Sequence, residues 1–311
     1  MNTETSALPS DSLPPLSEFL PLAEVRPFRS WTFWFGPLVS IAILAATFIA
    51  LRHFDAGPVL RMVPRSPSFW LLLLLFYVLG PLTDFVIFRR LWALPADGLG
   101  ALLRKQLSNE LLMGYVGEVY FYSWAREHGA VTNTPYGAIK DVTVLSALAG
   151  NLVTLLLLLP ALPLLVANPG LVNTHLLAWS IAVVCVSSAL AMLFRKRLFS
   201  LPPAERRFVI AMHLVRIIGS FLLLALLWHL VLPAVDARWW LLLVTLRQLV
   251  SRLPLLPNKD IIFAALAVLL IGPHLAVSSL MAMMAGLILA AHFVTALIFC
   301  GSDFIRNLVR S

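Results

Sequence analysis

The stretch GYVGEVYFYSWAREHG, residues 114–129, carries side chains that can exchange protons or bind ions, although most of the chain is apolar. If the part beyond its glycines is helical, four polar residues share one face at spacings of three, four and four: Tyr115, Glu118, Tyr122 and Arg126. Such a face suits a proton- or head-group-responsive site, with Glu118 as the group that changes charge. The alternative is structural: Glu118 caps a short helix or pairs with Arg104 or Arg126, and the tyrosines form an interfacial belt.

A second group of charged residues, between positions 247 and 260, is mainly basic. It consists of Arg247, Arg252 and Lys259, with Asp260 beside them. An arginine side chain binds phosphate through two parallel hydrogen bonds, and a lysine adds a point charge. The group therefore predicts a seat for a phospholipid or polyprenyl-phosphate head group, or else ordinary anchoring to anionic lipid at the interface.

Arg216 is the clearest charge inside an apolar run, eight residues from its start, and His213 and Ser220 share its helical face. An arginine at such depth costs about 2.5–3.5 kcal/mol on insertion scales, so it must face protein or water. It is either part of a structural ion pair or a functional cation, and its expected partners are Glu118, Asp141 or Glu110. Asp84 is expected to form a local pair with Arg89 and Arg90.

The amino-acid composition indicates whether these charged residues lie in a water-soluble protein or in a membrane protein. The chain has 311 residues, of which 60% are hydrophobic and 12% charged, with a mean hydropathy of +0.91. A water-soluble protein of this size would expose one continuous apolar surface, so the sequence predicts an integral membrane protein. The net charge of +8 then indicates cytoplasmic loops and anionic lipid rather than nucleic acid. No metal-binding, cofactor-binding or catalytic motif is present, so no cofactor is expected.

Six apolar runs reach the roughly 20 residues that a membrane-spanning helix needs. They are Trp31–Leu51, Phe69–Phe88, Ala138–Val166, Leu176–Phe194, Phe208–Leu232 and His274–Phe299. Two further apolar regions, Leu99–Trp124 and Trp239–Leu270, are interrupted by charges, glycines or prolines. Residues 1–28 are predicted to be a flexible cytoplasmic tail, and residues 29–311 a single membrane domain.

Basic residues predict the orientation, because lysine and arginine concentrate in cytoplasmic loops. The loop Arg195–Arg207 is the strongest basic cluster, and both termini and the segment after Arg90 belong on the same side. From Arg90 to Arg195 the chain must then cross an even number of times, and two full spans already do so. Leu99–Trp124 is therefore predicted to be a re-entrant hairpin from the cytoplasm, and Trp239–Leu270 one from the outer side.

The predicted fold is thus all-α, with about six spans and two re-entrant hairpins. The two units Phe69–Val166 and Phe208–Phe299 each run span, hairpin, span, and they enter the membrane from opposite faces. Inverted repeats with broken helices that meet near the midplane are typical of secondary transporters.

Three motifs carry a resemblance to a known family: Gly117-Glu118 in GYVGEVYFYSWAR, the helix start from Ala138 to Asp141, and RLPLLPNKDIIFAALAVLLIG. From Trp31 to Phe299 the chain resembles the lysylphosphatidylglycerol synthase transmembrane-region family. Phe121 stands where that family often has an arginine, and Asn258-Lys259-Asp260 replaces its glycine turn and glutamate. The resemblance implies lipid handling of the flippase type, without the soluble domain that performs the synthase chemistry.

The leading functional hypothesis is a bacterial inner-membrane protein that moves an anionic or amphiphilic lipid between leaflets. Its polar passage would be lined by Glu110 and Glu118 on one hairpin and by Arg247, Arg252 and Lys259 on the other. One alternative is a membrane-embedded enzyme that modifies a lipid head group, with Glu118 or Asp260 as general base. Another is a non-catalytic scaffold for a lipid-synthesis or glycosyltransferase partner.

Overall fold

The structure, a computed structural model, describes residues 61–112, 115–127, 135–167, 199–251, 259–261 and 276–310, together with 182, 185–186, 189, 263–264 and 267. All regular secondary structure in these ranges is helical, as predicted. The tail predicted for residues 1–28 lies outside them.

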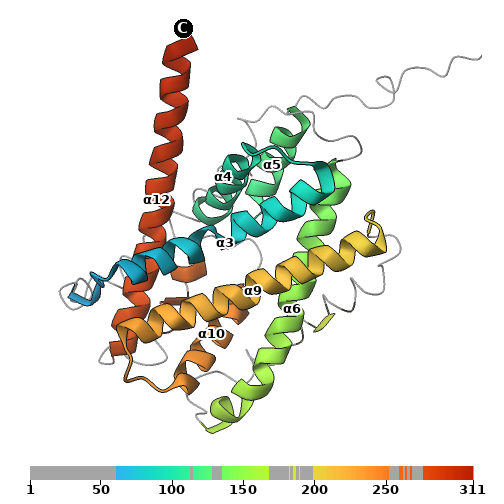
Figure 1. The fold of residues 1–311 in the computed structure, drawn as a ribbon. Helices are drawn as coiled ribbons and strands as arrows, with labels where there is room; N and C mark the ends of the chain where they lie inside the picture. The colour runs from blue at the N-terminus through green and yellow to red at the C-terminus, as the bar shows by residue number, and fades with distance from the viewer. Residues whose placement is uncertain are drawn as a thin grey trace, which may run out of the picture. The chain divides into compact units, whose positions relative to one another are not determined.

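Seven long helices make up the part of the chain that the structure describes (Figure 1). They are α3 (Pro67–Trp92), α4 (Gly98–Leu111), α5 (Val116–Glu127), α6 (Pro135–Ala167), α9 (Pro203–Val231), α10 (Ala237–Ser251) and α12 (Ala276–Arg310). Proline occupies the first turn of α3 and of α9, where its missing N–H removes no intrahelical hydrogen bond.

Four of these helices contain stretches that are long and apolar enough to cross a membrane. The stretches are Pro67–Trp92, Gly137–Pro160, Pro203–Val231 and Ser279–Gly301, each with a mean hydropathy of 2.2. The shortest, with 23 residues, covers the hydrocarbon core at about 1.5 Å per residue. These stretches coincide with four of the six predicted spans. Of the other two, Trp31–Leu51 lies outside the described residues, as does Leu176–Phe194 except for four positions.

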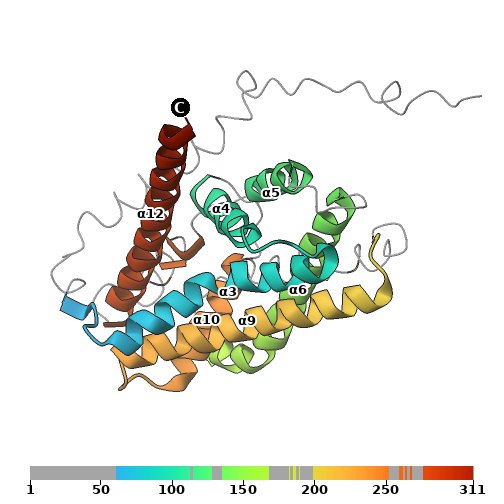
Figure 2. The ribbon, with the colours of Figure 1, turned by 45° about the horizontal axis from the view of Figure 1, so that its top comes forward.

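Helices α3 and α9 lie side by side and antiparallel (Figures 1 and 2). Near the start of α3, Phe69 is buried in the same apolar cluster as Trp228, near the end of α9. Near the end of α3, the guanidinium of Arg90 bonds Glu205 in the first turn of α9, with Nε 2.9 Å from Oε2. The pair therefore has a first end, at Arg90 and Glu205, and a second end, at Phe69 and Trp228.

Helix α6 also begins at the first end. Asp141, near its start, is fully buried, and its Oδ2 accepts the backbone N–H groups of Ser200 and Leu201 at 2.6 and 2.7 Å. Ser200 and Leu201 immediately precede α9, so they fix the start of α6 beside the start of α9. The chain between α3 and α6, which includes α4 and α5, thus returns to the end that it left.

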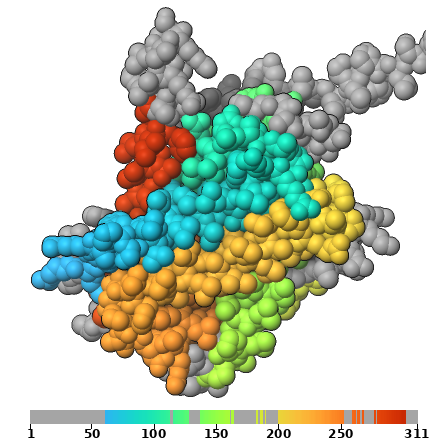
Figure 3. Space-filling model, in the orientation of Figure 1, coloured from blue at the N-terminus to red at the C-terminus, as the bar shows by residue number. Residues whose placement is uncertain are grey.

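Helices α4 and α5 form a hairpin that packs against α3 and α6 (Figure 2). The hairpin closes at Gly117, whose N–H donates to Asn109 Oδ1 at 2.7 Å. A Cβ at position 117 would overlap the backbone carbonyl of Lys105, so only glycine permits this approach. Tyr115, in the turn before α5, has a φ of 75°, in the left-handed region. In the space-filling view, the surface of α4 lies along α3 on the side away from α9 (Figure 3).

The segment after α9 leaves from the second end. The Trp228 ring lies 5.7 Å from the ring of Trp240 at the start of α10 and 6.1 Å from that of Phe263. Val277, at the start of α12, belongs to the same apolar cluster. The two interrupted regions, Leu99–Trp124 and Trp239–Leu270, which we call the first and second broken segments, therefore begin at opposite ends of the α3–α9 pair. The 29 residues of α9 measure about 44 Å at 1.5 Å each. The re-entrant course of the two broken segments through a membrane stays a prediction.

Candidate functional site

A polar cavity of about 290 Å³ opens between the helices of this bundle. Its lining comes from α3, α4, α5, α6 and α9 and from Ser251 and Lys259 of the second broken segment. The charged residues among the described part of the lining are Asp84, Lys105, Glu110, Glu118, Arg216 and Lys259. We call this space the first cavity. Since it combines both signs of charge with apolar outer helices, it can accommodate a polar or charged group that the surrounding lipid would exclude.

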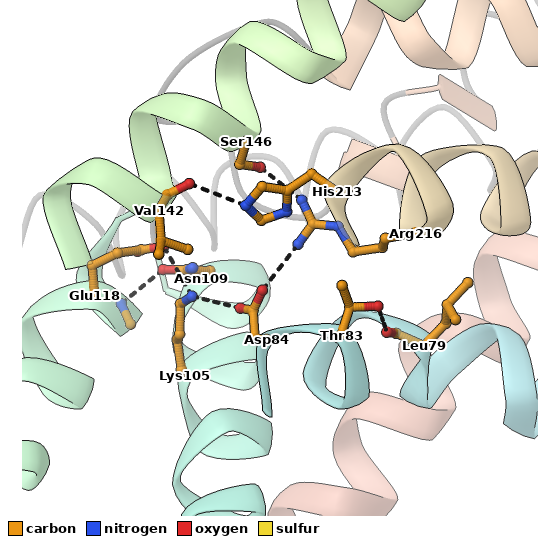
Figure 4. Close-up of polar contacts among 11 residues, drawn as sticks. Leu79, Thr83, Asp84, Lys105, Asn109, Glu118, Val142, Ser146, His213 and Arg216 are labelled. Atoms are coloured by element: carbon orange, nitrogen blue, oxygen red, sulfur yellow. Dashed lines mark hydrogen bonds and ion pairs between the residues drawn. The ribbon is translucent and has the colours of Figure 1, made fainter. Parts of the chain in front are cut away.

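Asp84 is the centre of an ion cluster in the first cavity (Figure 4). Its Oδ2 accepts a hydrogen bond from Lys105 Nζ at 2.8 Å, and its Oδ1 lies 3.4 Å from Arg216 Nη1. Burial lowers the pKa of Lys105, but the charges of Asp84 and Glu118 outweigh it, so the pKa is raised and the lysine stays protonated. The expected local pairing of Asp84 with Arg89 and Arg90 is wrong, because Asp84 lies on the inward face of α3.

Arg216 has different partners from those predicted. Its Nη2 donates to Ser146 Oγ at 2.7 Å, and its carboxylate partner is Asp84 rather than Glu118, Asp141 or Glu110. Asp141 is unsuitable because it binds the two backbone N–H groups before α9. The neighbouring His213 is buried, and its Nε2 lies 3.1 Å from the carbonyl oxygen of Val142, so Nε2 carries the proton of that hydrogen bond.

Glu118 lines the first cavity, as the sequence suggested, and the cation beside it is Lys105. Its Oε1 lies 3.6 Å from Lys105 Nζ, and its Oε2 is buried without a hydrogen-bond partner among the described residues. Gly117 holds this carboxylate in place, because its N–H bond to Asn109 anchors the first turn of α5 to α4. The arrangement leaves one carboxylate oxygen able to accept a hydrogen bond from a ligand.

A second cavity, of about 280 Å³, adjoins the first. Five residues line both: Gly80, Gln106, Glu110, Arg216 and Ser251. Within it, Arg247 Nε bonds Asp260 Oδ1 at 2.7 Å, and the guanidinium lies 5.5 Å from the centre of the Phe76 ring. Lys259 Nζ donates to the carbonyl of Ser251 at 3.0 Å. Of the predicted basic residues of this segment, Lys259 thus shares the lining of the first cavity with Glu110 and Glu118, and Arg247 shares that of the second with Glu110.

Glu110, in the last turn of α4, stands where the two cavities meet. It has no hydrogen bond or ion pair with any described residue. Burial, and next the charge of Asp260, raise its pKa to about 7, against the opposing effects of Lys259 and Arg247. Glu110 is therefore able to gain or lose a proton near neutral pH.

No protein-family model, curated protein or solved structure matches this chain. The resemblance to the lysylphosphatidylglycerol synthase transmembrane-region family thus stays a prediction, and the site must be interpreted from its own geometry.

Of the remaining predicted residues, Tyr115 lines the first cavity, whereas Tyr122 and Arg126 line neither. Arg126 is exposed, and its guanidinium lies 5.8 Å from the centre of the Tyr122 ring. The expected four-residue face is therefore divided, with its second half directed away from the cavities. Arg252 lies outside the described residues.

Several residues that line the cavities were not singled out from the sequence. The sequence predicts no site role for Lys105 and only a local ion pair for Asp84. The available signal was that a carboxylate within an apolar span is a functional candidate by default. Gln106 and His292 gave no comparable signal. Gln106 Nε2 donates to the Tyr77 carbonyl at 3.3 Å, and His292 Nδ1 lies 3.1 Å from the Tyr77 hydroxyl.

The charged side chains of the cavities are suited to ion binding and proton exchange. Among the described residues, no group of three or more histidine, cysteine, aspartate or glutamate side chains is placed to hold a metal ion. The charged residues are instead arranged as acid–base pairs from different helices. Such an arrangement can bind a charged head group by replacing one of its internal pairs.

Proposed function

We propose that this protein moves a phosphate-bearing, anionic or amphiphilic lipid between the two leaflets of a bacterial inner membrane. The observation that carries the proposal is the shared lining of the first cavity: Glu110 and Glu118 from the α4–α5 hairpin and Lys259 from the second broken segment. The head group would cross through this polar space while its acyl chains stay in lipid.

The course of the two broken segments supports this route. The α4–α5 hairpin departs from the first end of the α3–α9 pair and the segment beginning with α10 departs from the second end, yet both reach the cavities. In the proposed membrane topology, the two segments would be re-entrant hairpins of an inverted repeat. Irregular backbone at that depth is tolerated where it is buried in protein or lines a polar cavity. The same plan fits the proposed relationship to the lysylphosphatidylglycerol synthase transmembrane-region family.

Basic residues at the first end support a cytoplasmic assignment for that end. Arg89 and Arg90 lie in the last turn of α3, and Lys140, Arg206 and Arg207 lie in the first two turns of α6 and α9. With both termini assigned to the same side, the tail of residues 1–28 would also be cytoplasmic. Cysteine labelling tests this topology, because Glu127 and Arg238 are exposed and follow different ends of the bundle.

For that test, Glu127→Cys and Arg238→Cys are each introduced after replacing Cys185 and Cys300, which are free and exposed, by serine. In intact cells, a membrane-impermeant thiol reagent should label position 238 and spare position 127. Labelling of both, or of position 127 alone, would contradict the proposed topology.

The transport proposal is tested with purified protein in vesicles that contain a fluorescent phosphatidylglycerol. A membrane-impermeant reductant then measures how fast the labelled lipid reaches the outer leaflet. Glu118→Gln and Arg247→Gln should each slow the exchange about tenfold or more, as expected for the loss of a charge-assisted hydrogen bond. The matched controls are the exposed Glu127→Gln and Arg126→Gln, which should exchange lipid at the wild-type rate.

Two results would overturn the proposal. In the first, wild-type vesicles exchange lipid no faster than protein-free vesicles. In the second, both cavity variants retain the wild-type rate. Chemical conversion of the labelled lipid would favour a head-group-modifying enzyme, and a stoichiometric partner in the purified material, without exchange, would favour a scaffold.

A further inference from the structure

Glu110 differs from the other described carboxylates of the two cavities in having no hydrogen-bond or ion-pair partner within the part of the chain that the structure describes. Asp84 binds Lys105 and Arg216, Glu118 lies 3.6 Å from Lys105, and Asp260 binds Arg247 at 2.7 Å. No described residue offers Glu110 a hydrogen bond or an ion pair. Its position in the shared lining places it between the Asp84 cluster and the Arg247–Asp260 pair.

Titratable or charged groups line this space from several of the surrounding elements. Among the described residues they are Tyr77 and Asp84 on α3, Lys105 on α4, Tyr115 in the turn before α5, Glu118 on α5, His213 and Arg216 on α9, Arg247 on α10, His292 on α12, and Lys259 and Asp260 on the second broken segment, whereas α6 contributes only uncharged residues. Asp260 disfavours a negative charge on Glu110, whereas Lys259 and Arg247 favour it. Since Asp260 already holds Arg247, the guanidinium is only partly available to Glu110.

The net charge of the residues that line the two cavities depends on whether Glu110 carries a proton. Among the described residues, four cations line the cavities, Lys105, Arg216, Arg247 and Lys259, and so do four carboxylates, Asp84, Glu110, Glu118 and Asp260. With Glu110 ionised these eight described groups are formally neutral together, and with Glu110 protonated they carry one positive charge. A phosphate-bearing head group with one negative charge is therefore best accommodated when Glu110 is protonated.

We propose that Glu110 is a proton-binding site and that it takes up one proton from the aqueous side when an anionic phosphate head group enters the cavities. Lipid movement would then be coupled to proton movement in the same direction. This inference rests on the proposed transport function, but proton uptake at Glu110 can be measured without any transport. The raised pKa of Glu110 supports the idea, because burial and the charge of Asp260 both favour the protonated form of its carboxyl group.

The first experiment follows the infrared carbonyl band of protonated carboxyl groups while the purified protein is titrated in uncharged detergent. Wild type should show a band that disappears with a midpoint near pH 7, and Glu110→Gln should lack it. Glu127→Gln, at an exposed position, should retain it. Asp260→Asn should move the midpoint to lower pH, because it removes the neighbouring negative charge and releases Arg247. A wild-type band that does not titrate, or one that persists in Glu110→Gln, would overturn the proposal.

The second experiment adds a short-chain phosphatidylglycerol, a short-chain phosphatidylcholine or inorganic phosphate to the same titration. Phosphatidylglycerol should raise the midpoint, and the net-neutral phosphatidylcholine should leave it in place. An unchanged midpoint with phosphatidylglycerol would overturn the coupling. An equal shift with inorganic phosphate would overturn the lipid form of the proposal and assign the cavities to free phosphate.

Vesicle exchange at different pH values completes the test. Exchange of phosphatidylglycerol should rise several-fold from pH 8 to pH 6 in wild type and be independent of pH in Glu110→Gln. Equal pH dependence in both proteins would overturn the coupling. If no lipid moves at any pH while the infrared midpoint still responds to phosphatidylglycerol, the transport function fails and the proton-binding site stands.

Discussion

Lys105 Nζ lies 2.8 Å from Asp84 Oδ2, and the two side chains are only 11% and 10% exposed. This pair joins α4 to α3, and Arg216 extends it to α9. A buried ion pair contributes little net stability by itself, but removing one partner leaves a buried charge without compensation. The pair therefore fixes which faces of the three helices meet around the cavities.

Replacing Lys105 by methionine should lower the free energy of unfolding by about 3–5 kcal/mol, because Asp84 and Glu118 would both lose the ammonium that they share. Thermal unfolding of the purified protein in detergent measures the effect. The matched control is Arg238→Gln, because Arg238 pairs with Asp236 in a setting where the side chains are 77% and 58% exposed. That change should cost no more than about 1 kcal/mol. Equal stabilities of the two variants would contradict the conclusion that the Lys105 ammonium compensates the carboxylates of Asp84 and Glu118.

Gly117→Ala should open the α4–α5 hairpin, because the added methyl group would overlap the Lys105 backbone carbonyl, which cannot move aside as a flexible side chain would. We expect a loss of about 1–3 kcal/mol or more in stability, together with slower lipid exchange. Gly286→Ala in α12 is the control, since a Cβ there meets no atom within 4 Å. It should be neutral or should stabilise the helix by up to about 1 kcal/mol. A harmless Gly117→Ala would show that the hairpin does not need this close approach.

Pro81 and Gln106 should behave as a coupled pair. Proline 81 lacks the N–H that would bond the Tyr77 carbonyl within α3, and Gln106 Nε2 supplies the missing donor at 3.3 Å. Gln106→Ala should therefore cost about 1 kcal/mol in the wild-type background and less in Pro81→Ala, where the helix bonds its own carbonyl. A double-mutant cycle on unfolding free energies measures the difference. Strict additivity would contradict the compensation.

Stability should fall with rising pH through the contribution of Glu110. Its pKa is about 7 in the folded protein and 4.5 ordinarily, so the unfolded chain loses this proton first as the pH rises. The contribution is complete below about 4.5, decreases between 4.5 and 7, and is absent above about 7. The difference in melting temperature between wild type and Glu110→Gln should therefore change across this window and be constant above it. A difference that is flat throughout would contradict a raised pKa.

The membrane-spanning helices are the part of the fold that the local sequence predicts best. The stretches in α3, α6, α9 and α12 follow from uninterrupted apolar runs, because backbone hydrogen bonds satisfied within one segment make a helix the expected form in lipid. The sequence also predicts that Leu99–Trp124 is not one continuous membrane-spanning helix, because charged residues and the glycines at 114 and 117 interrupt it. Glu110, Glu118 and Arg216 were recognised because charge is costly among such residues.

The choice of partners required the tertiary structure. Asp84 stands near Arg89 and Arg90 in the sequence, but it binds Lys105 and Arg216, which are 21 and 132 positions away. Sequence alone determined which residues are too costly to leave in lipid, because that cost depends on the side chain and its apolar neighbours. Only the packing of α3, α4 and α9 decided which of them meet, because an ion pair depends on the helix faces that come together and not on distance along the chain.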